Sequence, residues 1–272
     1  MAACRLALPS AQDGVADLFD MRARALRRDR AARAGVELFL YERAFSDCLE
    51  RIGLIDRRFR RALLIGCPDP NWAARLRALL ADLEIRDPGP LFAASAGGKL
   101  LIEDEWEPLA DAYDLVLAIG TLDSVNDLPL ALRLIRHAMQ GDALFIGAVS
   151  GGETLPQLRG AMRVADALAG VAAPHVHPRI DASSLAPLLS DSGFVRPVVD
   201  VDRASVAYSS LDRLVSDLRQ MGTTNVLSVR PHFIGKAARA AAYRAFADAG
   251  DGGRTIETFE VLHFAAWTAS NT

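Results

Sequence analysis

The sequence has little cysteine: among its 272 residues there are 3, Cys4, Cys48 and Cys67. Their number is odd and their spacing matches no metal-binding motif, so the sequence gives no sign of a disulfide framework or a cysteine-rich zinc site. Unpaired cysteines fit a reducing compartment. We therefore expect a soluble, cytoplasmic protein.

The sequence also lacks an apolar run long enough to span a bilayer, and no signal-peptide core precedes a small-residue cleavage site. Its formal net charge of -3 leaves no overall basic excess, which argues against general nucleic-acid binding. Acidic residues such as Asp20 and Asp29 interrupt the one basic cluster, whereas transit peptides avoid acids. We interpret this cluster as a solvated helix face; it contains Arg22, Arg24, Arg27, Arg28, Arg30 and Arg33.

Glycine is scarce where a nucleotide-binding loop would need it. Residues 62–65 form a short apolar run typical of a buried strand, and the turn that follows reads Gly66-Cys67-Pro68-Asp69-Pro70. Apolar residues then recur at helical spacing from Trp72 to Leu80. Strand, tight turn and helix form the opening of a nucleotide-binding α/β unit. Pro68 and Pro70, which lack an N–H, stand where further glycines are expected.

The remaining pattern alternates strands and helices over a chain that is 51% hydrophobic, long enough for one sizeable core. It predicts an α/β fold with a doubly wound, mostly parallel sheet and helices on both faces. We expect a helical lid at 1–57 and a main domain at 58–272 with a helical insertion at about 203–250. Further strands are expected at 90–94, 99–102, 113–119, 143–149, 194–201 and 255–267, and helices at 18–33, 34–52, 127–139, 154–168, 181–190, 211–221 and 233–247.

The region after the second expected strand is unusual. Residues 96–98 leave no room for a helix before the strand at 99–102, so we expect these neighbours to pair antiparallel or irregularly. Asp87 is the acid nearest to the ribose-binding position, but a Pro-Gly-Pro sequence separates it from the strand at 90–94, and we interpret it as a turn residue. The acidic patch at 103–107 either receives an adenine amino group or is a solvated turn.

Two histidines, His175 and His177, flank Val176 and would point the same way in an extended segment. They could share a metal, but spacing reveals no third ligand. We favour two other interpretations: this loop, with Arg179, lies near a pocket mouth and binds an anionic substrate, or the loop is merely structural. Tyr41 either lines the ligand mouth or belongs to the core. The sequence contains no Gly-X-Ser-X-Gly elbow, no Walker loop and no cysteine with a histidine partner. We therefore exclude hydrolase and kinase functions.

Several motifs resemble the S-adenosylmethionine-dependent methyltransferase superfamily, and within it the malonyl-carrier-protein methyltransferases and the mitochondrial complex I assembly-factor, or arginine hydroxylase, branch. The resemblance implies a Rossmann-like methyltransferase fold with an antiparallel last strand, and it covers most of the chain. The motifs are Asp114–Pro129, Leu144–Ala148, Gly151–Arg159, Leu18–Asp20, Pro174–Pro178, Gly193–Phe194 and Asp217–Gly222.

The resemblance implies S-adenosylmethionine as cofactor. Its cofactor loop falls on Gly66, Cys67, Pro68 and Asp69, its ribose-binding acid on Ser95, its adenine-contacting acid on Glu103 beside Asp104, and its next contacts on Ile119 and Gly120. The implied substrate positions are Tyr41, Asp123, His175, His177, Arg179 and Tyr208. No catalytic residue is implied, since methyl transfer needs little beyond positioning.

Departures from the family pattern lead to our functional hypothesis. Leu64 stands where the family prefers an acid, Ser95 replaces an aspartate, and Asp123-Ser124 replaces a His-Trp pair. We predict a methyltransferase-like protein with impaired or lost cofactor binding, acting on a small-molecule or protein acceptor. The alternative is a respiratory-complex assembly factor or scaffold with a protein partner; arginine hydroxylation would in addition need an oxidant.

Overall fold

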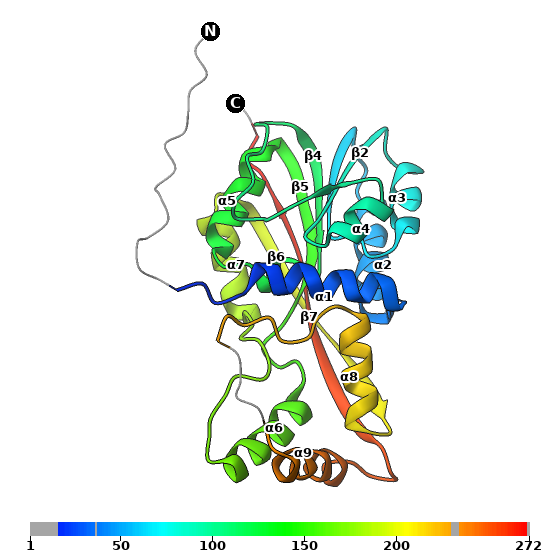
Figure 1. The fold of residues 1–272 in the computed structure, drawn as a ribbon. Helices are drawn as coiled ribbons and strands as arrows, with labels where there is room; N and C mark the ends of the chain where they lie inside the picture. The colour runs from blue at the N-terminus through cyan, green and yellow to red at the C-terminus, as the bar shows by residue number, and fades with distance from the viewer. Residues whose placement is uncertain (1–15, 36, 230–233, 271–272) are drawn as a thin grey trace.

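A computed structural model describes residues 16–35, 37–229 and 234–270. Their strands form one seven-stranded sheet in the order β3-β2-β1-β4-β5-β7-β6 (Figure 1). The first five strands in sequence pair in parallel, and β7 pairs antiparallel with both β5 and β6. This confirms the predicted Rossmann-like fold. The strands are β1 (Arg61–Ile65), β2 (Asp82–Asp87), β3 (Lys99–Leu100), β4 (Tyr113–Ile119), β5 (Met139–Ser150), β6 (Val195–Tyr208) and β7 (Thr255–Trp267).

Helices cover both faces of this sheet. Along β1, Leu63 packs in a core cluster with α5 and α7, whereas Leu64 packs on the other face with α2 and α3. Strand residues alternate in direction, so one buried strand serves both cores. No helix of the described residues is long and apolar enough to cross a membrane. The helices are α1 (Met21–Ala34), α2 (Phe39–Gly53), α3 (Pro70–Arg77), α4 (Pro90–Ser95), α5 (Leu128–Ala138), α6 (Pro156–Ala169), α7 (Ala182–Asp191), α8 (Leu211–Gln220) and α9 (Lys236–Asp248), with a 3-10 turn η1 (Leu122–Ser124).

The strand predicted at 90–94 is wrong, because this segment forms α4. Pro90 occupies the first turn of that helix, where its missing N–H has no partner to lose. The second strand lies earlier, at β2, whose charged residues alternate with Leu83 and Ile85. The prediction of antiparallel or irregular pairing after it is also wrong: β2 pairs with β3 in parallel, and the short α4 makes the crossover.

The strand predicted at 194–201 continues to Tyr208 and forms a long antiparallel ladder with β7. In Figure 1 the far end of this ladder projects from the sheet and meets α6, α8 and α9. Side chains from these elements form a separate apolar cluster around Leu214, Phe246 and Phe259. The helix predicted at 233–247 is observed as α9, Lys236–Asp248. Its predicted first residue, Phe233, lies outside the described residues.

Helix α1 crosses the sheet at the carboxyl ends of the strands, in front of the central ones in Figure 1. Asp20 caps its first turn by accepting a hydrogen bond from the Ala23 N–H at 2.8 Å. The residue before the cap is also fixed, since Phe19 exchanges hydrogen bonds with the Asn126 side chain and forms a β-bridge with Leu227. These contacts place the basic cluster over the site described next.

Candidate functional site

The turn after β1 is built around Gly66. Its φ is +87°, and a Cβ atom there would lie 2.3 Å from the Ile119 carbonyl oxygen, so only glycine fits. The turn then enters α3, with Pro70 in the first turn and Asp69 as cap, accepting from the Asn71 N–H at 2.9 Å. Because Pro70 begins a helix, the missing N–H costs the fold nothing. The fold itself therefore requires the glycine and tolerates this proline.

Asp87, interpreted from the sequence as a turn residue, is the buried last residue of β2. It stands where this fold places a ribose-binding acid, so the assignment of that role to Ser95 does not match the structure. The Ser95 hydroxyl instead donates to the Phe92 carbonyl inside α4. The error follows directly from the misplaced second strand.

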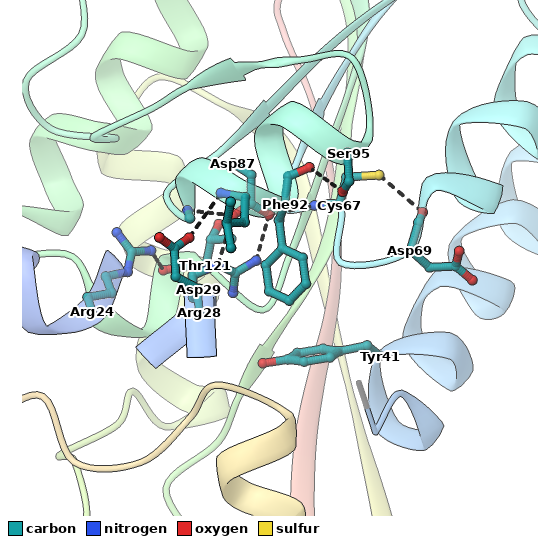
Figure 2. A network of polar contacts seen from close by, with 12 residues as sticks. Arg24, Arg28, Asp29, Tyr41, Cys67, Asp69, Asp87, Phe92, Ser95 and Thr121 are labelled. Atoms are coloured by element: carbon teal, nitrogen blue, oxygen red, sulfur yellow. Dashed lines mark hydrogen bonds and ion pairs between the residues drawn. The ribbon is translucent and has the colours of Figure 1, made fainter. Parts of the chain in front are cut away.

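The Asp87 carboxylate accepts four hydrogen bonds. The Arg28 guanidinium donates two, Nε to Oδ1 at 2.8 Å and Nη2 to Oδ2 at 2.6 Å. The backbone N–H groups of Cys67 and Gly89 donate the others, at 2.8 and 2.6 Å. A carboxylate offers about four lone-pair sites, so this one is fully used by the protein. Figure 2 shows Arg28 reaching it from α1.

Glu103, expected to contact adenine, is engaged in the same way by Arg24, one helical turn before Arg28. Arg24 Nη1 and Nη2 donate to Glu103 Oε2 and Oε1 at 2.7 and 2.8 Å, and Nη2 also donates to the Thr121 carbonyl at 2.6 Å. Asp104 points elsewhere and accepts from the Asp127 N–H at 2.8 Å. Both predicted types of cofactor-binding acid are thus paired with one helix.

These ion pairs are shielded from water. The side chains of Arg24 and Arg28 are 4% and 5% exposed, and those of Glu103 and Asp87 are 0% exposed. Burial by itself would lower the pKa of Arg28, but the charge and hydrogen bonds of Asp87 raise it above its usual value. The guanidinium therefore stays charged. Bidentate pairs of this kind are geometrically specific as well as strong.

Tyr41 fills the space next to Gly120. A Cβ atom on Gly120 would lie 2.2 Å from Cε1 of the Tyr41 ring, so the ring rests against the glycine backbone. Burial raises the pKa of Tyr41 to about 12. The cavity that remains between this ring, Arg24 and Arg28 is about 20 Å³. That volume holds about one water molecule and no nucleoside.

On the far side of Tyr41, Asp123 pairs with Arg179, with 2.7 Å between Oδ2 and Nη1. Both residues line the small cavity beside Tyr41 and an apolar cavity of about 60 Å³ between α2, α8 and β7. Arg179 Nε is buried without a hydrogen-bond partner. The structure therefore brings four of the predicted substrate residues together: Tyr41, Asp123, His177 and Arg179.

The two histidines of the 173–178 loop do not act as a pair. His177 Nε2 accepts from the Val226 N–H at 2.8 Å, and its ring meets Phe19 edge-on at 5.4 Å. Burial and the nearby Arg179 lower the pKa of His177 to about 4. His175 pairs instead with Asp166 at 2.8 Å. The described residues contain no group of three potential metal ligands among His, Cys, Asp and Glu.

Tyr208 lies in the cluster formed by α6, α8 and α9, with its ring 6.5 Å from that of Phe259. It is not placed with Asp123 and Arg179. Conversely, the sequence interpretation missed Arg24 and Arg28 as site residues. Two features of the sequence could have revealed them. Arg24 and Arg28 are spaced by one helical turn, and the acid Asp87 ends the alternating pattern of β2.

No protein-family model matches the chain. Among known proteins it is similar to the mitochondrial arginine-hydroxylase NDUFAF5 of Danio rerio, at 30% identity over 240 residues, covering 84% of this chain and 75% of the relative. The same protein of Mus musculus is 30% identical over 274 residues, covering 92% and 77%. The malonyl-[acyl-carrier protein] O-methyltransferase of Xylella fastidiosa is 31% identical over 169 residues, covering 60% and 55%.

Solved structures agree on the fold. The YcgJ protein of Bacillus subtilis has a TM-score of 0.54 at 11% identity and covers 82% of this chain and 98% of its own. Phosphoethanolamine N-methyltransferase 2 of Haemonchus contortus, in complex with S-adenosyl-L-methionine, has a TM-score of 0.51 at 12% identity, covering 83% and 52%. At such low identity the similarity concerns the fold alone.

Proposed function

Because the chain belongs to the NDUFAF5 arginine-hydroxylase family, within the S-adenosylmethionine-dependent methyltransferase superfamily, we propose that it is a methyltransferase-like protein with impaired donor binding that acts on a protein partner. The observation that carries the proposal is the pairing of Asp87 with Arg28. In this fold an acid at the end of the second strand accepts hydrogen bonds from the ribose hydroxyls. Here that acid has no free lone pair.

The magnitude of the effect supports impaired binding. A hydrogen bond to a charged group contributes about 1.5–3 kcal/mol, and about 1.4 kcal/mol changes an affinity tenfold. A donor molecule would have to displace Arg28 from Asp87 and Arg24 from Glu103, leaving two guanidiniums without their buried partners. Together with the cavity of about 20 Å³, this disfavours the donor by several orders of magnitude in the closed arrangement. The residues do not fit the cofactor as they stand.

Residues 1–57 act, in this proposal, as a lid over the crevice; α1 and α2 are its described helices. The names of the NDUFAF5 relatives give a mitochondrial location, and this location is known for those relatives and not for this chain. A cytoplasmic location for this chain stays a prediction, as does an assembly role with a protein partner. A partner that binds α1 would expose Asp87 and Glu103 and so link partner binding to the crevice.

The second candidate function is methyl transfer by an open form. It is favoured by Tyr41, Asp123 and Arg179, which still converge beside Gly120, where the resemblance places the donor. Such an enzyme would need α1 to move before the donor could bind. The acceptor would then be held by the Asp123–Arg179 pair.

A donor-binding experiment separates the two candidates. Thermal unfolding of the purified chain is measured against increasing S-adenosylmethionine and S-adenosylhomocysteine, because a ligand that binds only the native state raises the melting temperature. We expect no shift at micromolar ligand for the wild type. Replacing both arginines, Arg24→Ala with Arg28→Ala, should create a shift by freeing the acids.

The matched control removes two exposed arginines from the same helix, Arg22→Ala with Arg30→Ala. It changes the net charge equally but leaves both buried pairs intact, so it should behave as the wild type. A clear shift of the wild type at micromolar donor would overturn the proposal of impaired binding. Methylation of a co-purified protein under those conditions would favour the second candidate.

A further inference from the structure

A cavity of about 200 Å³ lies beside η1, α5 and α7, and Asp123 and Arg179 line both this cavity and the small one beside Tyr41. Its wall is formed by core side chains that are otherwise closely packed; Leu122, Leu132, Leu185, Leu189 and Phe264 are between 0% and 3% exposed. Leu18, which is 48% exposed, also lines the cavity, so the cavity is partly open to solvent. A concave, mainly apolar space of this size is a candidate ligand site.

Among the residues that the structure describes, two charged ones line this cavity, Asp123 and Arg179. The Arg179 side chain is 5% exposed and makes one ion pair, from Nη1 to Asp123, while Nε has no hydrogen-bond partner. A buried donor without a partner destabilises the folded protein, because it has lost its hydrogen bond to water. A ligand that offers an acceptor atom at this point would remove that cost.

The charge around Arg179 favours an anion. Arg159 donates to carbonyl groups, including those of Thr154 at 3.1 Å and of His177 at 3.4 Å. Burial and the charges of Arg179 and Arg163 lower the pKa of Arg159, and the carboxylates of Glu153 and Glu257 act in the opposite sense but more weakly. The positive charges of Arg159 and Arg179 thus repel each other, and an anion bound at Arg179 would offset this repulsion. His177 is neutral at pH 7, so it adds no charge.

We propose that this cavity binds a monocarboxylate with an apolar body of about six to eight carbon atoms, with its carboxylate on Arg179. An engineered apolar cavity of about 150 Å³ takes up benzene, so a cavity somewhat larger than that suits a medium aliphatic chain or a phenyl group. The walls supply the burial of the apolar body, and Arg179 supplies the polar contact that fixes its orientation. Such a ligand does not require the donor crevice to be open, although Arg179 also belongs to the pair that would hold the acceptor in the second candidate function.

Isothermal titration calorimetry of the full chain with octanoate tests the proposal. The comparison ligands are butanoate, which lacks most of the apolar body, and 1-octanol, which keeps the body but lacks the charge. We expect one octanoate per chain, bound about tenfold or more tighter than either comparison ligand. Absence of octanoate binding, or equal affinity for octanoate and 1-octanol, would overturn the proposal.

Two variants locate the site. Arg179→Gln removes the charge, so octanoate should bind about tenfold more weakly while 1-octanol is unaffected. Leu185→Phe fills the cavity, so both should lose affinity. Circular dichroism establishes that each variant is folded, and the wild-type ligand series decides the outcome if either is not. The control is Arg133→Gln, an exposed arginine of α5, which should bind octanoate as the wild type does. Unchanged octanoate affinity in folded Arg179→Gln would place the ligand elsewhere and refute the site.

Discussion

Arg28 of α1 and Asp87 of β2, 59 residues apart in sequence, form a bidentate ion pair that solvent does not reach. The pair joins the first described helix to the sheet at the point where this fold holds its nucleotide. Its Phe92 neighbour lies 5.1 Å from the Arg28 guanidinium, which places an aromatic ring against the cation as well. The same residues therefore stabilise the position of α1 and close the crevice.

Breaking this pair on one side should destabilise the protein strongly. Removing one partner of a buried ion pair typically costs about 3–5 kcal/mol, because the other charge stays buried without compensation. We expect Arg28→Met to lower the free energy of unfolding by that amount in urea titrations. The double variant Arg28→Met with Asp87→Asn should lose clearly less than the sum of the single variants, since neither charge remains. Additive losses would show that the two side chains are not coupled.

The glycine of the first turn should prove structural. Gly66→Ala places a methyl group 2.3 Å from a backbone oxygen and forces a positive φ on alanine, so we expect a loss of at least about 3 kcal/mol in unfolding free energy. Pro68→Gly, two residues later, should cost about 1 kcal/mol or less, by loosening the unfolded chain. Neither change should restore donor binding, because Asp87 remains paired. Micromolar donor binding by Pro68→Gly would mean that the proline, and not Arg28, closes the site.

The sequence predicted most of the sheet. The mainly apolar β4 coincides with the predicted 113–119, and β7 coincides with 255–267 although Glu257 and Glu260 interrupt its apolar residues. The prediction failed at β2, where Asp82, Glu84 and Arg86 mask a strand near the sheet edge that buries one face only. That error moved the ribose-binding acid from Asp87 to Ser95. Composition also could not reveal that α1 folds back onto the crevice, since an arginine-rich helix looks alike whether it faces water or buried carboxylates.

Both described cysteines should resist thiol reagents in the folded protein. Burial raises the pKa of both Cys48 and Cys67 to about 12, and neither side chain is exposed. Only a thiolate reacts readily, so we expect the reagent to label these two cysteines only after the protein unfolds. In a Cys4→Ser background we expect no rapid reaction with a chromogenic disulfide reagent and two thiols per chain after addition of denaturant. Fast reaction of Cys67 without denaturant would indicate that the turn after β1 opens in the native state.

His177 should make the protein less stable in mild acid. Its folded pKa of about 4 lies below the ordinary value of 6.5, so as the pH falls the unfolded chain takes up the proton first. The stabilisation is complete above about pH 6.5 and is lost between there and pH 4, up to about 3 kcal/mol. His177→Gln keeps an acceptor for the Val226 N–H but cannot titrate, so its unfolding free energy should fall less over this range. The comparison uses urea titrations at several pH values, with His137→Gln on the exposed face of α5 as control. Equal pH dependence in wild type and His177→Gln would mean that folding does not shift the pKa of this imidazole, so that it takes up a proton in the fold as readily as in the unfolded chain.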